Sequence, residues 1–415
     1  MTKSRRLLAL LASTSMLAVP AFAQEDVVTI QFWEGHSVQE EQATIRMIEA
    51  FEASHPNIKV ERIKTSFGTN FERITTAVAS NSAPDVSPIW SGFLTQFAEQ
   101  GQLADLTQYG VSAEETDIYP GAFEYVLWND GVYGLPYAYD PRFLVMNDQA
   151  FADAGITEPP KTFDELITQI EQLTVGTPGN IERYGFGLGG ADSLAYFFIN
   201  LLYAEGGQVF NEDGTEVVFN NEAGVAAGEI ISRLAELPGA ALNAGEGLRQ
   251  NVLQGRVAMI YDGPWVFYDA SNDPESQPIS ISRVPMPNAD DVPLNFGSVG
   301  AYVVYEQSDN KEAAAEFVKF LASAEAQQYR VAMLKPGVSP GVFEAPEAIA
   351  TFEENPGLRT AQELLEESRI FPRHKNWPSV FQAIIPAVEA IISGEEPQTA
   401  LDNAANQVNR TLRRG

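Results

Sequence analysis

DGVYGLPYAYDPRFLVMN, residues 130–147, is the stretch that decides how the rest of the chain is arranged. Two short extended runs, 132–139 and 143–147, flank Asp140 and Pro141, and a proline biases the residue before it toward extended backbone. Three tyrosines, one carboxylate and one guanidinium crowd residues 133–142, and aromatic faces beside a few fixed polar groups are typical of small-ligand pockets. Tyrosine is also common in cores. The stretch alone leaves both interpretations open, so the rest of the chain must decide between them.

The length and the first residues indicate an exported protein with two domains or lobes. A chain of 415 residues is too long for one ordinary core. Residues 1–23 have the pattern of a secretory signal peptide, since basic residues precede an apolar run at 7–19 and Ala-Phe-Ala supplies the cleavage pattern. That run is shorter than the roughly 20 residues that span a bilayer. We expect cleavage near Ala23 and a protein that diffuses freely in a bacterial periplasm.

Charge and composition exclude several classes of partner and site. The formal net charge is −30, and such a chain is repelled by nucleic acid and by anionic lipid. The absence of cysteine excludes disulfides, thiolate metal sites and a lipid-modified cysteine. The three histidines (His36, His55 and His374) have no metal-ligand spacing. We therefore expect no metal, no cofactor and no nucleic-acid partner, and a monomer.

The order of elements predicts an α/β fold. Strands are expected at 27–32, 58–63 and 86–90, with helices at 37–54 and 71–79 between them, which favours a parallel sheet covered by helices. A second α/β block follows residues 130–147, with a capped helix from Thr162 and a strand at 257–261. The proline-rich segment 273–295 indicates a return crossing. It precedes a strand at 301–305, an amphipathic helix at 311–321, and closing helices at about 358–368, 378–393 and 397–413.

Ligands of open α/β sheets bind beyond the carboxyl ends of the strands, which nominates residues there. The candidates at these ends are Trp33, Glu34, His36, Trp90, Ser91 and Trp265. An alternative for Trp33 is that it caps the core. A Gly-x-Gly-x-x-Gly pattern at 185–190 formally matches a dinucleotide fingerprint, but it does not open a first βαβ unit. We interpret it as a glycine-rich turn at a cleft.

No catalytic machinery is evident, so binding is favoured over catalysis. One enzymatic reading remains, a secreted glycosidase that uses the carboxylates Glu34 and Asp140. A carboxylate beside tryptophans can equally accept hydrogen bonds from sugar hydroxyls without chemistry. A third possibility is an adhesin or a structural protein that binds no small molecule.

Eight segments, in the same order along the chain, resemble the extracellular solute-binding proteins, family 1, of ABC sugar importers. They span essentially the whole mature chain and read IQFW (30–33), ASNSAPDV (79–86), QFAEQGQLADL (96–106), DGVYGLPY (130–137), PPKTFDEL (159–166), GRVAMIYDGPW (255–265), NKEAAAEFVKFL (310–321) and SGEEPQTAL (393–401).

The resemblance implies a type II periplasmic binding protein fold, in which the chain crosses between two lobes several times. We expect residues 24–140 and 285–328 in the N-terminal lobe and residues 141–284 and 329–415 in the C-terminal lobe. A carbohydrate is expected in the cleft, and the membrane permease of an ABC importer is the expected partner after hinge closure. The resemblance implies ligand contacts from Trp33, Glu34, Ser91, Tyr139, Asp140, Gly189, Trp265 and Arg373. Five neighbouring residues complete the candidate set: His36, Trp90, Arg142, Ser298 and Trp377.

One position departs from the family pattern. Many relatives carry Gly-Gly-Trp-Gly before the returning strand, with a tryptophan that stacks on sugar, whereas this chain has Gly-Ser-Val-Gly at 297–300. The missing stacking platform at Val299 favours a monosaccharide, a disaccharide or a polyol over a long oligosaccharide.

Overall fold

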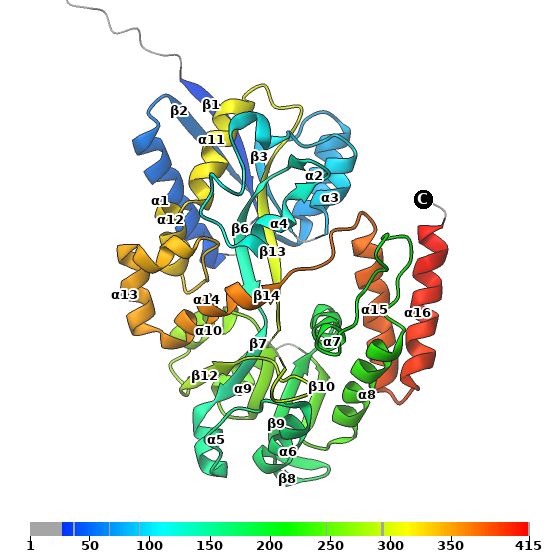
Figure 1. Ribbon diagram of the computed structural model, residues 1–415. Helices are drawn as coiled ribbons and strands as arrows, with labels where there is room; N and C mark the ends of the chain where they lie inside the picture. Colours follow the sequence, from blue (N-terminus) through cyan, green and yellow to red (C-terminus); the bar gives the residue numbers. More distant parts are fainter. Residues whose placement is uncertain are drawn as a thin grey trace, which may run out of the picture.

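The computed structural model describes residues 27–35, 38–65, 67–90, 92–245, 247–291 and 294–413. The expected signal peptide and its cleavage site lie outside these residues. Figure 1 shows two α/β bodies, one built from blue, cyan and yellow segments and one mainly from green segments, with long strands running between them. No helix in the described residues combines the length and the apolar character that crossing a membrane requires.

The first body is organised on a six-stranded sheet of order β14-β13-β3-β1-β2, in which β6 also pairs with β13. β1 pairs in parallel with β2 and with β3, as the sequence predicts, but β13 runs antiparallel to both β3 and β6. The sheet is therefore mixed. Its strands are β1 (Val28–Glu34), β2 (Ile58–Lys64), β3 (Val86–Trp90), β6 (Leu135–Pro141), β13 (Asn295–Val304) and β14 (Ser368–Arg369).

Helices on both faces of this sheet enclose the first core. The expected inward residues of α11, which are Ala314, Phe317, Val318 and Leu321, are all fully buried, so this prediction is confirmed. The helices are α1 (Val38–Ser54), α2 (Phe67–Ala79), α3 (Leu94–Glu99), α4 (Pro120–Tyr125), α11 (Lys311–Ala322) and α12 (Ala324–Val331). The short 3-10 helix η1 (Leu106–Tyr109) and the hairpin of β4 (Leu127–Trp128) and β5 (Gly131–Val132) complete this body.

The second body is organised on a sheet of order β10-β9-β11-β7-β12, with β8 paired to β9. β7 runs antiparallel to β11 and β12, while β9 is parallel to β10 and β11. The strands are β7 (Phe143–Asn147), β8 (Val175–Thr177), β9 (Asn180–Gly189), β10 (Ala240–Ala244), β11 (Val257–Asp262) and β12 (Ile279–Ser282).

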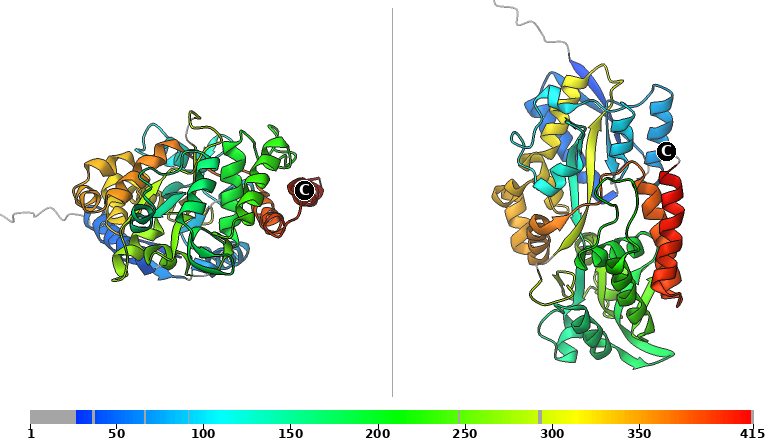
Figure 2. Two further views of the ribbon diagram at one scale, coloured as in Figure 1. Left: turned by 90° about the horizontal axis from the view of Figure 1, so that it is seen from below. Right: turned by 45° about the vertical axis from the view of Figure 1, so that its right-hand side comes forward.

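The helices of the second body include the two that end the chain. A capping box of Thr162 and Glu165 begins α6, as the sequence predicts. Figure 2 shows α15 and α16 lying together beside the green helices. The helices are α5 (Asp148–Ala154), α6 (Phe163–Leu173), α7 (Asp192–Ala204), α8 (Glu222–Glu236), α9 (Leu248–Leu253), α10 (Trp265–Asn272), α15 (Trp377–Ile392) and α16 (Pro397–Leu412).

A third helical group differs from the sequence prediction of one helix at 358–368. It consists of η2 (Pro340–Glu344), α13 (Pro346–Glu354), α14 (Pro356–Glu363) and η3 (Leu364–Glu367). Pro346 and Pro356 each stand at the start of a helix, where the missing N–H of proline is not needed. This group packs on β7 through Phe143 and Val145.

The long strand β13 corrects the expectation of a strand that begins at residue 301. It starts at Asn295, so Gly297–Gly300 lie inside the strand and not in a loop. The two glycines are needed there because a Cβ at Gly297 would lie 2.5 Å from the Tyr139 ring, and one at Gly300 would lie 2.8 Å from the Tyr137 ring. Val299 is 1% exposed and belongs to the first core.

The chain crosses between the two bodies at three places. The chain passes from β6 to β7 through Arg142, returns from β12 to β13, and passes from β14 to α15. The residue limits of the two lobes given above stay a prediction.

Candidate functional site

A cavity of about 680 Å³ lies where the two bodies meet. Side chains from the first body, from the crossing strands and from the second body all line it. The lining residues are Glu40, Trp90, Phe93, Asp140, Arg142, Asp192, Ser193, Tyr196, Arg249, Tyr261, Asp262, Trp265, Ser298, Phe371, Trp377, Pro378, Phe381 and Gln382. Its volume lies within the range of small-molecule sites.

The crossing residue Arg142 is held between two aromatic rings. Its guanidinium carbon lies 4.3 Å from the centroid of Tyr196 and 4.4 Å from the centroid of Trp265. Arg142 is 8% exposed, and it forms no ion pair with a described residue. Gly263 allows this packing, because a Cβ there would collide with Trp265 and lie 2.6 Å from Arg142 Nη1. The aromatic rings therefore fix the guanidinium in the cavity wall.

A buried ionic cluster supports the cavity from the first body. Arg330, on α12, donates to Glu40 of α1 at 2.7 Å and to Asp140 of β6 at 3.1 Å, and its Nε donates to the Pro336 carbonyl at 3.0 Å. These carboxylates raise the pKa of Arg330 against the opposing effect of burial. Arg330 therefore stays charged, and it fixes two of the carboxylates that line the cavity.

A second cluster lies on the opposite wall. Arg249, on α9, pairs with Asp262 at the end of β11 at 2.8 Å and with Asp269 on α10 at 2.5 Å. Burial raises the pKa of Asp262, while Arg249 and Arg142 oppose that rise. The two clusters share one pattern, since each has two carboxylates on one arginine.

Aromatic rings form the third wall. Tyr196 lies 5.1 Å from Phe371 and 5.3 Å from Phe381 between ring centroids, and Phe371 lies 4.7 Å from Trp377. Trp377 is 2% exposed and packs closely against Gly92 of the first body, where a Cβ would collide with the indole. The two bodies are thus in contact at this wall.

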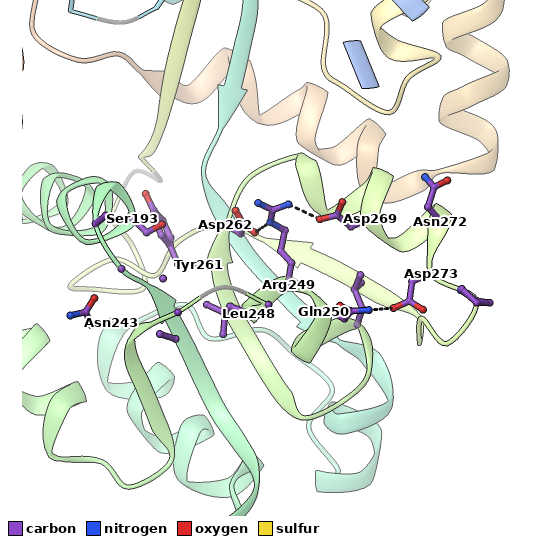
Figure 3. Close-up of a pocket in the computed structure, with 18 residues that line it drawn as sticks. Ser193, Asn243, Leu248, Arg249, Gln250, Tyr261, Asp262, Asp269, Asn272 and Asp273 are labelled. Atoms are coloured by element: carbon purple, nitrogen blue, oxygen red, sulfur yellow. Dashed lines mark hydrogen bonds and ion pairs between the residues drawn. The ribbon is translucent and has the colours of Figure 1, made fainter. Parts of the chain in front are cut away.

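A groove of about 940 Å³ adjoins the cavity on the second body (Figure 3). The two spaces share Ser193, Arg249, Tyr261 and Asp262 in their linings. In Figure 3 the Arg249 side chain pairs with Asp262 and Asp269, and Gln250 approaches Asp273. Six of the described residues that line the groove carry an amide or a carboxylate, and Tyr261 is the one aromatic residue among them, in contrast to the aromatic cavity.

The chemistry of the cavity suits a polyhydroxylated ligand. Carboxylates accept hydrogen bonds from hydroxyl groups, guanidinium groups donate to hydroxyl oxygens, and rings cover apolar faces. The described residues contain no group of three or more His, Cys, Asp or Glu side chains that could hold a metal ion.

The structure brings six of the predicted site residues together at this cavity. They are Trp90, Asp140, Arg142, Trp265, Ser298 and Trp377. His36 and Ser91 lie outside the described residues.

Five other predicted residues do not line the cavity. Tyr139 is fully buried, and its hydroxyl donates to the Ser368 carbonyl. Trp33 packs on the first core under Arg73, whose guanidinium carbon is 4.6 Å from the ring centroid. Arg373 donates to Glu124 at 3.1 Å and to the Leu127 carbonyl at 3.2 Å. The other two are Gly189, which lines the adjoining groove, and Glu34, which is fully buried.

The carboxylates of the glycosidase alternative do not share the cavity. Glu34 is fully buried and pairs with Arg62, whereas Asp140 lines the cavity and pairs with Arg330. Each carboxylate is held by its own arginine, so they do not form an acid and nucleophile facing one substrate.

Several lining residues were missed because their signals are weak in the sequence. Asp192, Ser193 and Tyr196 begin the helix after the glycine pattern of 185–190, so the expected cleft turn could have nominated them. Phe381 stands one helical turn after Trp377, on the same face. Glu40 and Arg249 had no such signal, since only packing brings these helices to the cavity.

Comparisons with known proteins agree with this architecture. Residues 35–328 match the family described as bacterial extracellular solute-binding protein. A binding protein of Brucella abortus is 24% identical over 98% of each chain, and the diacetylchitobiose binding protein of Streptomyces coelicolor is 24% identical over 82% of this chain and 80% of its own. The GacH receptor of Streptomyces glaucescens, solved without ligand and with acarbose, superimposes with a TM-score of 0.77 at 26% identity and covers 93% of this chain and 99% of its own.

These relatives and the two mixed sheets give the fold its class, a type II periplasmic binding protein of the maltose-binding kind. Members of the family are exported binding components of ABC importers that work with membrane permeases. The chain belongs to the bacterial extracellular solute-binding protein family.

Proposed function

We propose that this protein captures a carbohydrate in the cavity between its lobes and delivers it to the permease of an ABC importer. The observation that carries the proposal is the composition of the cavity, in which Trp90 of the first body, Asp140 of a crossing strand and Trp265 of the second body line one space. A ligand that contacts both lobes binds the closed arrangement more tightly than the open one. This difference in affinity shifts the equilibrium toward closure.

The ligand we propose is a monosaccharide, a disaccharide or a polyol. The volume of about 680 Å³ supports a ligand of this size. Val299 does not limit the length of the ligand, because it is buried in the first core and does not line the cavity. The adjoining groove would give room to further sugar units, so ligand length has to be measured.

The ligands of two relatives support the choice of carbohydrate. One relative binds diacetylchitobiose, and the GacH receptor was solved with acarbose. Identities of 24% and 26% make these sugars starting points for a screen. We further propose that the protein acts as a periplasmic monomer after cleavage near Ala23, and that it has no enzymatic activity.

A thermal-shift panel tests the proposal. The purified mature protein is heated with monosaccharides, disaccharides, maltotriose, diacetylchitobiose and polyols, because a ligand that binds only the native state raises its stability. Small-angle scattering with each stabilising sugar then measures compaction. No stabilisation by any sugar would contradict carbohydrate binding, and stabilisation without compaction would contradict closure. Release of the aryl group from an aryl glycoside would instead indicate a glycosidase.

A further inference from the structure

Lys335 is a buried lysine behind the ligand cavity. It follows α12 and is 1% exposed. Leu334 before it has a φ of +60°, and the Lys335 N–H donates to the Arg330 carbonyl at 3.3 Å. The Gln362 side chain holds the next turn through the Gly337 N–H at 2.8 Å and the Gly337 carbonyl at 2.9 Å. The backbone of this segment is therefore fixed, and it directs the lysine inward.

The ammonium group of Lys335 ends against the indole of Trp265. Its Nζ lies 4.8 Å from the ring centroid, while Arg142 approaches the same ring to 4.4 Å. Trp265 belongs to the second body and lines the cavity, whereas Lys335 follows a helix that packs on α1 of the first body. This contact therefore joins the first body to the wall of the ligand cavity.

No described carboxylate forms an ion pair with Lys335. The charged groups around it are Asp140 on β6, Glu40 on α1, Arg330 on α12 and Arg249 on α9. Arg142 and Arg249 also approach the Trp265 indole, to 4.4 and 6.0 Å from its centroid. Both carboxylates already accept hydrogen bonds from Arg330, and the charges of Arg330 and Arg249 repel the ammonium. Cation–π contact with Trp265 is thus the one direct polar contact that the described residues offer the ammonium.

An ammonium in this position does not favour folding. Burying a charge without an ion pair is unfavourable, and burial lowers the pKa of Lys335 to about 8. Because this value lies below the roughly 10.4 of an unfolded lysine, the charged form destabilises the native state below pH 8, and the penalty disappears as the pH rises toward 10. A residue kept solely for stability would not be a lysine here.

We propose that Lys335 is a positioning residue for ligand binding, whose ammonium holds the Trp265 indole in the cavity wall. The inference rests on the proposed function. A desolvated cation–π contact fixes the orientation of an indole ring relative to the cation. The affinity of the cavity for its ligand then depends on the charge of Lys335.

The first experiment needs no ligand. The ¹H–¹⁵N signal of the Trp265 indole, assigned with Trp265→Phe, is followed from pH 6.5 to 9.5 in the wild type, Lys335→Met and the exposed-site control Lys161→Met. We expect a midpoint near 8 in the wild type and the control, and none in Lys335→Met. An indole signal that does not titrate, or that titrates equally in Lys335→Met, overturns the inference.

The second experiment measures the dissociation constant of a sugar identified by the thermal-shift panel. At pH 7 we expect Lys335→Met to bind about tenfold more weakly than the wild type, and Lys335→Arg to restore binding without a pH dependence between 7 and 9.5. Unfolding at pH 7 is measured in parallel, with Lys335→Met expected to be more stable than the wild type. Lower stability of this variant would indicate a structural role and overturn the inference.

The outcomes separate the two proposals. If sugars bind and Lys335→Met matches the wild type in affinity, this inference fails and the proposed function stands. If no sugar binds the wild type, the proposed function fails, and the positioning role fails with it.

Discussion

Arg330 donates to Asp140 across 3.1 Å, and this bond ties a helix of the first body to the strand that leaves for the second. The same guanidinium holds Glu40 at 2.7 Å, so one buried cation neutralises two carboxylates of the cavity wall. Removing it leaves both without their principal partner.

We therefore predict that Arg330→Met destabilises the protein by about 3–5 kcal/mol, the range found when one partner of a buried ion pair is removed. Urea unfolding measures the change. Arg359→Met is the matched control, because Arg359 is exposed and its pair with Glu363 contributes roughly 0–1 kcal/mol. Equal losses in the two variants would contradict a structural role for the buried cluster.

Arg142 is expected to contribute to ligand affinity through its place between two rings. Arg142→Met should weaken sugar binding by roughly tenfold, because each cation–π contact contributes about 1–2 kcal/mol to the cavity wall and a guanidinium can donate hydrogen bonds to sugar hydroxyls. Arg73→Met is the control, since Arg73 covers Trp33 away from the cavity. Calorimetry on both variants checks the prediction, and an unchanged affinity in Arg142→Met would refute it.

Gly263 allows the close approach of Arg142 and Trp265. Gly263→Ala should lower sugar affinity, because the added Cβ displaces the Trp265 ring and the Arg142 guanidinium. Gly245→Ala, in the adjoining groove, is the matched control for a monosaccharide, because no atom lies within 4 Å of the added carbon. Binding is compared by titration for both variants. The idea is wrong if Gly263→Ala binds as the wild type does.

Asp262 should make stability depend on pH in a specific direction. Because burial raises its pKa, the native state takes up a proton more readily than the unfolded state, and the carboxylate becomes unfavourable as the pH rises through the raised pKa. Asp262→Asn should therefore be at least as stable as the wild type at pH 7, since Asp269 still pairs with Arg249, and its advantage should shrink at pH 4. Asp164→Asn, at an 81% exposed site, is the control in the same melting series. If the stability advantage of Asp262→Asn over the wild type is larger at pH 4 than at pH 7, the predicted direction is wrong.

The lining residues that could be predicted from the sequence are those that follow the carboxyl ends of strands. Trp90 follows the rule that ligands bind beyond carboxyl ends, and so does Trp265, which follows β11 after a short turn. The same rule selected Trp33 and Glu34 at the end of β1. Trp33 instead packs on the first core, and Glu34 pairs with Arg62. Strand order and tertiary packing, which decide which ends face the cavity, are absent from a single sequence.

Alternation along strands explains another difference. Tyr139 and Asp140 were both expected at the ligand, yet adjacent residues of a strand point to opposite faces. Asp140 lines the cavity, and Tyr139 lies in the first core. The same alternation places Ser298 in the cavity wall and Val299 in the core. Arg249, Arg330 and Lys335 were not predictable, because helices distant in sequence bring them together.

The pairing of β6 with β13 has a mechanical consequence. Ser298 lies opposite Asp140, and Gly297 lies opposite Pro141, which has no N–H to donate. The Arg142 N–H then donates to the Phe296 carbonyl at 2.7 Å, which ties the two crossings together once more. Two crossings that are bonded to each other must bend as one ribbon, which restricts twisting between the lobes. In the closure that we propose, Asp140 and Ser298 lie on the rotation axis and move least. A sugar can therefore dock on these two residues before the walls reach it.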